Sequence, residues 1–253
     1  MANIAVLGYG TVGSGVVEVL NTNKDRINSK SYEPINIKYV LDLRDFPGGP
    51  VQEIITHDYN DILNDNTIDV VVEVMGGINP AYTFVKQALE SGKSVCTSNK
   101  ELVAAHGGEL MALAKEYNVN FLYEASVGGG IPIIRPINRS ITSDEIVKIV
   151  GILNGTTNYM LTKMSEEGLE YNDVLSDAQA KGYAERNPDA DVEGYDACRK
   201  IAILASLATE KTVSYDDIYT EGITNISKTD MDYVKKMGLS LIHISEPTRP
   251  LYI

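Results

Sequence analysis

A short apolar run that leads directly into three closely spaced glycines most constrains how this chain can fold. Residues 3–13 read N-I-A-V-L-G-Y-G-T-V-G, and a helical pattern follows over residues 11–20. A short apolar run bounded by glycine is typical of a buried strand. The start of the chain therefore predicts a strand over residues 3–7, a tight turn and a helix, which together form the first unit of a parallel α/β sheet.

The three glycines fit the pattern G-x-G-x-x-G, in which each glycine has its own physical role. Gly8 would allow the tight turn, Gly10 would let the backbone approach a pyrophosphate, and Gly13 would let helix and strand pack closely. The helix N-terminus, at Thr11 and Val12, would present N–H groups and the positive end of the helix dipole. These residues predict a binding site for a dinucleotide coenzyme.

Apolar runs continue to alternate with helical patterns through the first half of the chain. Further strands are predicted at 35–42, 69–74, 94–97 and 120–125. Helices are predicted at 80–91, with Pro80 in the first helical position, and at 101–117. This alternation predicts an α/β fold with a Rossmann-type, doubly wound parallel sheet.

The triple glycine at 128–130 changes the character of the sequence, and prolines follow it closely. We place a domain boundary there, between a first domain over residues 1–128 and a second over 129–238. The apolar run I-V-K-I-V-G-I-L at 146–153 predicts the first strand of a second, α+β domain. Helices of this domain are predicted at 157–166, 172–181 and 194–208.

The charge of the chain argues against some classes of partner. Acidic residues number 35 and basic residues 22, which gives a formal net charge of −13. Nucleic acid or an anionic membrane surface would require a basic face, so we expect neither partner. No run of about 18 apolar residues could span a bilayer, and the chain start lacks a signal-peptide pattern. The two cysteines, Cys96 and Cys198, lack metal-type spacing and suit a reducing compartment, so we expect a cytoplasmic protein.

Three residues near the ends of predicted strands bear on coenzyme binding. Asp42 could bond the ribose hydroxyls of NAD, whereas Arg44 could meet the 2′-phosphate of NADP. Because both are present, the choice of coenzyme stays open, and an exposed ion pair is the alternative for each. Lys100 follows the fourth predicted strand, at the edge where open α/β sheets hold ligands, and could face the reactive end of the coenzyme. The alternative, a surface lysine in a first helical turn, is opposed by the helix dipole.

An acid-rich stretch, G-Y-A-E-R-N-P-D-A-D-V-E-G-Y-D-A-C-R-K at 182–200, ends on a lysine. Its last residues have a helical pattern, so Asp196 and Lys200 would share one helical face. Hydride transfer at an alcohol needs a proton moved at the same oxygen, and a lysine held by a carboxylate can move it. Glu185 could bind the ammonium group of an amino-acid substrate. A surface salt bridge in a solvated acidic loop is the alternative.

Five segments carry a family resemblance when they are taken in chain order. They are G-Y-G-T-V-G, T-S-N-K-E, E-A-S-V-G-G-G-I-P, G-I-L-N-G-T-T-N-Y-M-L and the acid-rich stretch. Together they resemble the homoserine dehydrogenase family over about residues 2–238, and the last two are specific to it. The resemblance implies an oxidoreductase that interconverts L-homoserine and L-aspartate 4-semialdehyde with NAD or NADP, in threonine and methionine biosynthesis. It also implies a Rossmann domain, then a substrate-binding and dimerisation domain that is incomplete here, and a homodimer in the full-length protein.

The resemblance also implies roles for individual residues. Lys200 matches the catalytic lysine that donates a proton to the carbonyl, and Lys100 matches a lysine between coenzyme and substrate. Glu185 and Asp196 match substrate-binding carboxylates. The same pocket is matched by Gly182, Tyr183 and Thr156.

A monovalent-cation site, for Na⁺ or K⁺, is matched by Glu124, Val127, Gly129 and Ile131. Main-chain oxygens of a glycine-bent loop are suitable ligands for a hard cation. The alternative for this segment is a plain hinge between domains.

The end of the chain departs from the family pattern. After Gly238 the sequence L-S-L-I-H-I-S-E-P-T-R-P-L-Y-I resembles translated non-coding or adapter sequence more than it resembles the family. We therefore expect residues 239–253 to be a non-family tail. Two other functions stay open: a catalytically inactive dinucleotide-binding fragment, and a Rossmann oxidoreductase for another small amino acid.

Overall fold

The computed structural model describes residues 1–141 and 143–238, and the chain divides into two compact units. The first unit runs from Met1 to Ile133, and the second begins at Ile134. The division follows the triple glycine at 128–130. The expected tail, residues 239–253, lies outside the described residues.

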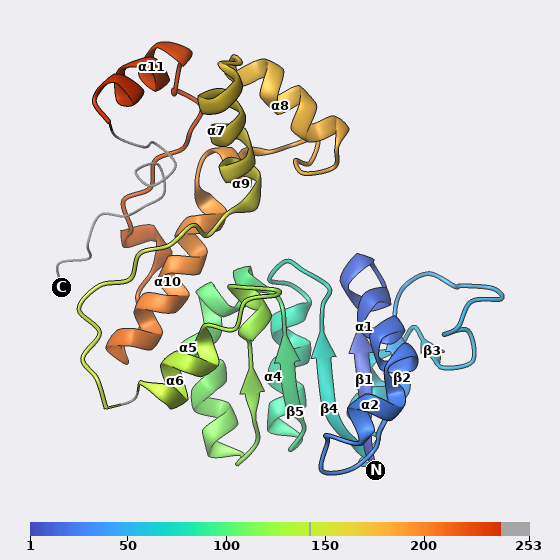
Figure 1. The fold of residues 1–253 in the computed structure, drawn as a ribbon. Coiled ribbons are helices and arrows are strands. Elements are labelled where there is room, and N and C mark those ends of the chain that lie inside the picture. The colour runs from blue at the N-terminus through green and yellow to red at the C-terminus, as the bar shows by residue number, and fades with distance from the viewer. Residues whose placement is uncertain (142, 239–253) are drawn as a thin grey trace. The chain divides into compact units, whose positions relative to one another are not determined.

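The first unit is built on one parallel sheet of six strands (Figure 1). The spatial order is β3-β2-β1-β4-β5-β6. Strands β2 and β3 are added on one side of β1 and strands β4 to β6 on the other, so the order reverses between β1 and β4. This is the Rossmann order, in which dinucleotides bind in the crevice at the reversal. The predicted doubly wound parallel sheet is therefore confirmed. The strands are β1 (Ala2–Leu7), β2 (Ile35–Leu41), β3 (Ile55–Thr56), β4 (Ile68–Glu73), β5 (Ser94–Thr97) and β6 (Phe121–Leu122).

Two strands differ from the sequence-based prediction. Strand β3 was not predicted, because two residues are too short to show an apolar period. The strand predicted at 120–125 stops at Leu122, and the chain turns into the short 3₁₀ helix η1 (Glu124–Ser126). Ser126 donates both its N–H and its hydroxyl to the carbonyl of Tyr123, at 3.0 and 2.6 Å, and so closes this turn.

Helices connect the strands of the first unit, and the predicted helices at 11–20, 80–91 and 101–117 are confirmed within a few residues. Pro80 is an exception, because it precedes its helix instead of occupying the first helical position. Its carbonyl accepts the first intrahelical bond, from the N–H of Phe84 at 3.1 Å, as an N-cap residue does. The helices are α1 (Thr11–Thr22), α2 (Lys24–Asn28), α3 (Tyr59–Leu63), α4 (Ala81–Glu90) and α5 (Lys100–Glu116).

A buried apolar cluster joins the central strands to α1. Val6 of β1 and Val40 of β2 are fully buried, and Val17 packs on them from α1. Burial of such a side chain contributes about 1.5–3 kcal/mol, so the cluster holds the end of β1 against the start of α1.

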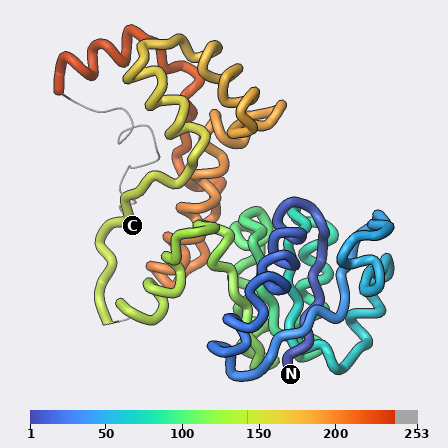
Figure 2. Tube along the Cα trace, turned by 45° about the vertical axis from the view of Figure 1, so that its right-hand side comes forward, coloured from blue at the N-terminus to red at the C-terminus, as the bar shows by residue number. Residues whose placement is uncertain are grey.

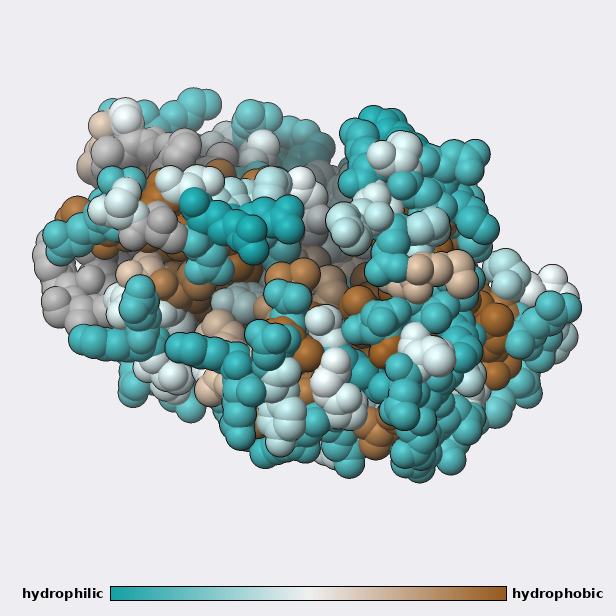
Figure 3. Space-filling model, turned by 90° about the horizontal axis from the view of Figure 1, so that it is seen from below, coloured by the Kyte–Doolittle hydropathy of each residue, from teal (hydrophilic) through white to brown (hydrophobic). Residues whose placement is uncertain are grey.

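Hydrophilic residues cover most of the face that Figure 3 shows, with smaller apolar areas between them.

The regular secondary structure in the described part of the second unit is entirely helical (Figure 2). Its core brings together Met160 and Met164 of α7 with Val174 and Ala178 of α8. The helices predicted at 157–166, 172–181 and 194–208 are confirmed as α7, α8 and α10. The elements are α6 (Ile134–Ser140), α7 (Gly155–Glu167), α8 (Tyr171–Ala180), α9 (Asp189–Val192), α10 (Tyr195–Thr209), the 3₁₀ helix η2 (Tyr215–Asp217) and α11 (Lys228–Lys236).

The strand predicted at 146–153 is wrong. Residues 146–153 have no regular secondary structure, and the described part of the second unit contains no strand with which they could pair. A β-strand forms only where its main-chain groups can hydrogen-bond to a neighbouring strand. An apolar run in the sequence does not show whether such a neighbour exists. The side chains of Val147 and Val150 are accordingly 88% and 60% exposed.

Candidate coenzyme and proton-transfer sites

The glycine loop connects β1 to α1 at the point where the strand order reverses. Gly8 has φ of +97°, in the region that favours glycine, and makes the tight turn. A Cβ atom at Gly8 would come within 3.1 Å of Met75, and one at Gly13 would lie 2.0 Å from the carbonyl oxygen of Gly8. Glycine at both positions is therefore what lets helix α1 begin so close to the strands.

The N-terminus of α1 offers main-chain donors to a ligand. Gly10 is the N-cap residue, and no side chain caps the first turn that Thr11 and Val12 begin. A Cβ atom at Gly10 would meet nothing within 4 Å, so the backbone borders open space there. Uncapped N–H groups and the helix dipole together favour a phosphate group at this position.

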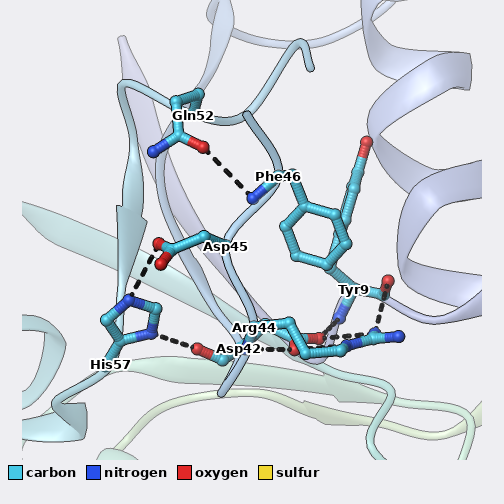
Figure 4. Close-up of polar contacts among 7 residues, drawn as sticks. All are labelled: Tyr9, Asp42, Arg44, Asp45, Phe46, Gln52 and His57. Carbon is cyan, nitrogen blue, oxygen red and sulfur yellow. Dashed lines mark hydrogen bonds and ion pairs between the residues drawn. The ribbon is translucent and has the colours of Figure 1, made fainter. Parts of the chain in front are cut away.

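Asp42 and Arg44 form an ion pair immediately after β2 (Figure 4). Arg44 donates from Nε to one carboxylate oxygen of Asp42 at 2.9 Å and from Nη2 to the other at 3.1 Å. The carboxylate also accepts the N–H groups of Tyr9, at 2.8 Å, and of Arg44 itself, at 3.0 Å. The Arg44 guanidinium holds the pKa of the Asp42 carboxyl well below its usual range, so the pair stays charged at neutral pH.

The two members of this pair differ in exposure. The side chain of Asp42 is 10% exposed and faces donors on several sides, whereas that of Arg44 is 62% exposed. The guanidinium also lies 5.2 Å from the centre of the Phe46 ring. The sequence raised ribose binding, phosphate binding and an ion pair as alternatives, and the geometry shows the ion pair.

His57 contacts the segment that follows β2, at Asp42 and Asp45, and the sequence analysis did not single it out. Its Nδ1 lies 2.6 Å from the carbonyl oxygen of Asp42, and its Nε2 lies 3.2 Å from the carboxylate of Asp45 (Figure 4). The hydrogen bond with the Asp42 carbonyl raises the pKa of His57, and the Asp45 carboxylate adds to this shift. Because His57 lies 15 residues from Asp42 and 12 residues from Asp45 along the chain, only folding brings it to them.

Lys100 is the first residue of α5, directly after the carboxyl end of β5. The N-cap residue Asn99 accepts the N–H of Leu102 through its side-chain oxygen, at 3.1 Å. Lys100 is half-buried at this edge of the sheet. Its position on the edge that holds ligands in open α/β sheets is the one that the sequence predicted.

Lys200 and Asp196 form a largely buried ion pair on α10 in the second unit. Nζ of Lys200 lies 2.7 Å from Oδ2 of Asp196, and the two side chains are 16% and 2% exposed. The ammonium group also donates to the carbonyl oxygen of Leu153 at 2.7 Å. An ammonium group has three N–H donors, so among the described contacts one donor of Lys200 is left for a ligand.

Asn154 completes this cluster, although the sequence analysis did not select it. Its amide donates to Asp196 at 3.0 Å and to Asp191 at 2.7 Å. Its carbonyl oxygen accepts the N–H of Thr157 at 2.8 Å and so caps α7. The signal was an asparagine that precedes a helical pattern, as N-cap residues do.

The other predicted pocket residues cluster around the end of α8. Thr156 donates its hydroxyl to the carbonyl oxygen of Tyr183 at 2.8 Å. Gly182 has φ of +75°, which turns the chain after α8, and the ring of Tyr183 is more than half exposed. The side chain of Glu185 is also exposed, and no contact within the described residues joins it to Lys200.

The segment 124–131 forms a tight main-chain turn at the end of the first unit. The carbonyl oxygen of Glu124 accepts the N–H groups of Val127 and Gly128, both at 3.3 Å. Among the described residues, no hydrogen bond is seen on the carbonyl oxygens of Val127, Gly129 and Ile131. These three oxygens remain able to take a cation. The described residues contain no cluster of His, Cys, Asp and Glu that would suit a transition metal.

Two family models match the chain. The model described as "Homoserine dehydrogenase, NAD binding domain" matches residues 8–124, and the model described as "Homoserine dehydrogenase" matches residues 132–248. The homoserine dehydrogenase of Bacillus subtilis (strain 168) is 42% identical over 245 residues, which are 94% of this chain and 56% of that protein.

Solved structures agree with these matches. A homoserine dehydrogenase from Thiobacillus denitrificans superposes with a TM-score of 0.87 at 37% identity, over 94% of this chain and 56% of its own. A hyperthermophilic archaeal homoserine dehydrogenase mutant, solved in complex with NADPH, superposes with a TM-score of 0.77 at 26% identity, over 90% of this chain and 75% of its own.

The chain spans about half the length of the curated relatives that it matches. In the part of the chain that the structure describes, no helix is long and apolar enough to cross a bilayer.

Proposed function

The chain belongs to the homoserine dehydrogenase family, with an NAD-binding domain first, and from this premise we propose that it transfers hydride between NAD(P) and a four-carbon amino acid. The substrates are L-homoserine in one direction and L-aspartate 4-semialdehyde in the other, in the pathway to threonine and methionine. The observation that carries the proposal is the ammonium group of Lys200, which Asp196 and the Leu153 carbonyl hold with one donor left over. A lysine held in this way suits proton transfer at a carbonyl oxygen.

The proton step rests on residues of α10 and the residue before α7. During reduction, Lys200 donates its proton to the carbonyl oxygen of the semialdehyde while that carbon receives the hydride. Asp196 and Asn154 hold the lysine side chain in place, because their polar atoms form one connected, buried network. Bound coenzyme supplies or accepts the hydride, and Lys100 at the edge of the sheet is proposed to lie between coenzyme and substrate.

The substrate pocket is proposed to include the turn after α8. Glu185 is exposed and anionic, so it can accept the ammonium group of the substrate. The bond between Thr156 and the carbonyl of Tyr183 ties the start of α7 to this turn, beside Gly182. Asp196 contributes the second carboxylate.

For the coenzyme, we propose NADP in preference to NAD. The Asp42 carboxylate already accepts donors from Tyr9 and Arg44, which leaves little capacity for ribose hydroxyls. The guanidinium of Arg44 is largely exposed and can turn toward a 2′-phosphate, which arginine binds with charge-assisted hydrogen bonds. The NADPH-bound relative is consistent with this choice.

Replacing Arg44 with alanine is expected to weaken NADPH binding by roughly 10- to 100-fold, since a hydrogen bond to a charged group contributes about 1.5–3 kcal/mol. NADH affinity should change by less than about threefold, because NADH carries no 2′-phosphate. Fluorescence titration of both reduced coenzymes measures the two constants. Arg26→Ala, on α2, is the matched control. An equal loss of affinity for both coenzymes would contradict the assignment.

A monovalent cation, Na⁺ or K⁺, is proposed at the turn 124–131. The carbonyl oxygens of Val127, Gly129 and Ile131 are hard donors, and the Glu124 carboxylate beside them holds the N–H of Ile133. The ion would fix the last turn of the first unit. Turnover measured in Na⁺, in K⁺ and in tetramethylammonium tests this, and equal rates would count against it.

We propose a homodimer for the full-length protein, which light scattering would detect as twice the chain mass. We also propose a cytoplasmic location, because Cys96 and Cys198 are free thiols, which suit a reducing compartment.

The direct test follows absorbance at 340 nm with purified chain, L-homoserine and each oxidised coenzyme. Reduction of coenzyme with L-homoserine, but not with L-serine, L-threonine or L-alanine, is the expected result. Coenzyme binding without turnover would favour the catalytically inactive fragment for this chain. Turnover with another amino acid in the panel would favour a different Rossmann dehydrogenase.

A further inference from the structure

The carboxylate of Glu73 is fully buried at the carboxyl edge of the sheet, and nothing in the proposed reaction uses it. Glu73 is the last residue of β4, paired with Leu7 of β1 on one side and with Thr97 of β5 on the other. It therefore lies next to the reversal in strand order, where the coenzyme crevice forms. Acidic side chains are rarely buried completely unless they are paired or hydrogen-bonded.

Each oxygen of this carboxylate accepts a hydrogen bond from a different segment of the chain, the loop after β4 or the end of β5. Oε1 accepts the main-chain N–H of Met75 at 2.8 Å, and Oε2 accepts the hydroxyl of Thr97 at 2.6 Å. The Thr97 hydroxyl in turn accepts the N–H of Asn99 at 2.9 Å. One carboxylate thus joins the loop after β4 to the connection between β5 and α5.

The Thr97 side of this network ends at Lys100. Asn99 caps α5 through its side-chain oxygen, and its amide donates to the carbonyl oxygen of Gly77 at 2.6 Å. Lys100 is the next residue. The direction of the first turn of α5, and with it the position of Lys100, is therefore tied to Glu73.

The Met75 side of the network ends at the glycine loop. Met75 packs on Gly8 so closely that a Cβ atom at Gly8 would lie 3.1–3.3 Å from its Cγ, Cα and N atoms. The adjacent Val74 has its Cγ2 within 3.3 Å of a Cβ placed at Gly13. The hydrogen bond that holds the N–H of Met75 therefore also holds the residues against which the glycine loop packs.

We propose that Glu73 is a positioning residue, which sets the glycine loop, the loop after β4 and the start of α5 in one arrangement that binds the coenzyme. The inference rests on the proposed function, since it assumes that a dinucleotide occupies this edge. The residue must accept two donors at once, from Met75 and Thr97. A carboxylate has acceptor oxygens at both ends, whereas an amide replaces one of them with a donor.

Thr97 gives the sharper test, because two substitutions separate its hydroxyl from its packing. Thr97→Val keeps the shape of the buried side chain and removes both bonds of the hydroxyl, the one to Glu73 and the one from the N–H of Asn99. Thr97→Ser keeps the hydroxyl and removes a methyl group. We expect Thr97→Val to raise the dissociation constant for NADPH by about tenfold, because the Glu73 carboxylate and the Asn99 N–H lose the hydroxyl that joins them. Thr97→Ser should bind NADPH within about twofold of wild type, even where its melting temperature falls, because it loses only packing.

Tyr59→Phe is the matched control for loss of one buried hydroxyl bond. Tyr59 is buried on α3 and donates to the carbonyl oxygen of Phe84 at 2.6 Å, away from the loops of the network. It should lower the melting temperature and leave NADPH affinity unchanged. Glu73→Leu, which has no acceptor oxygen for either Met75 or Thr97, should weaken NADPH binding at least as much as Thr97→Val.

The outcomes separate this inference from the proposed function. Weak binding by Thr97→Val together with rescue by Thr97→Ser supports the positioning role. Wild-type affinity in Thr97→Val overturns it and leaves the proposed function standing. Affinity that follows melting temperature across all variants, the Tyr59→Phe control included, also overturns it. Failure of the wild-type chain to bind NADPH overturns the coenzyme role itself, and this inference with it.

Discussion

Replacing Lys200 with alanine is expected to lower kcat by about 10²- to 10⁴-fold, the range that a positioned acid or base contributes. The dissociation constant for NADPH should stay within about twofold of wild type, because Lys200 belongs to the second unit and the glycine loop to the first. The pair of measurements consists of the 340 nm assay for turnover and a fluorescence titration for coenzyme binding.

Removal of Lys200 has a structural cost that the design must take into account. Asp196 is 2% exposed, and alanine at position 200 leaves its charge with the Asn154 amide but without the ammonium group. Breaking a buried pair in this way costs about 3–5 kcal/mol of stability. The double variant Lys200→Ala/Asp196→Asn also removes the buried negative charge, so part of its stability should recover while its turnover stays low.

Lys163→Ala provides the matched control for this experiment. Lys163 also forms an ion pair with a residue four positions away on a helix, Glu167 on α7, but that pair is more exposed. Its loss should cost little stability and no turnover, since exposed pairs contribute about 0–1 kcal/mol. Wild-type turnover in Lys200→Ala, or an equal loss in Lys163→Ala, would contradict the role of Lys200.

The first half of the fold could be predicted because its signals are local. Apart from the two-residue strand β3, the strands of the sheet lie in apolar runs bounded by turns, and the three glycines of the glycine loop lie within six residues of sequence. The pair Asp196 and Lys200 was predictable in the same way, since a spacing of four residues on a helix fixes a common face. In each case the chain positions that interact are close in sequence.

The features that were missed depend on partners far away in the chain. The run at 146–153 has the composition of a strand, but no described strand lies beside it. The sequence analysis did not single out Glu73, and only the pairing of β4 with β5 shows that Thr97 meets it. Asn154, the N-cap residue of α7, likewise meets Asp196 of α10 only in the folded chain, because 42 residues separate them in sequence. A single sequence contains no signal for such tertiary contacts.

Two glycines of α1 should respond in opposite directions to the same substitution. A Cβ atom at Gly13 would lie 2.0 Å from the carbonyl oxygen of Gly8 and 2.9 Å from its carbonyl carbon. These are main-chain atoms, so no side-chain rotation relieves the overlap, and the start of α1 must move away from the turn. Gly13→Ala is therefore expected to lower the free energy of unfolding by about 1–3 kcal/mol, as overpacking does. NADPH affinity should fall at least tenfold, because the displaced first turn carries the N–H groups that we propose bind the pyrophosphate.

Gly15, two residues further along the same helix, is the matched position. A Cβ atom there would meet nothing within 4 Å. Gly15→Ala should raise the free energy of unfolding by about 0.5–1 kcal/mol, because alanine loses less conformational entropy than glycine in a helix. NADPH binding should not change. Urea unfolding and coenzyme titration of the two variants measure both effects, and since the chemical change is identical, a difference between them isolates the contact at Gly13. Equal effects on unfolding and on binding would show that the close approach of α1 to the Gly8 turn does not build the coenzyme site.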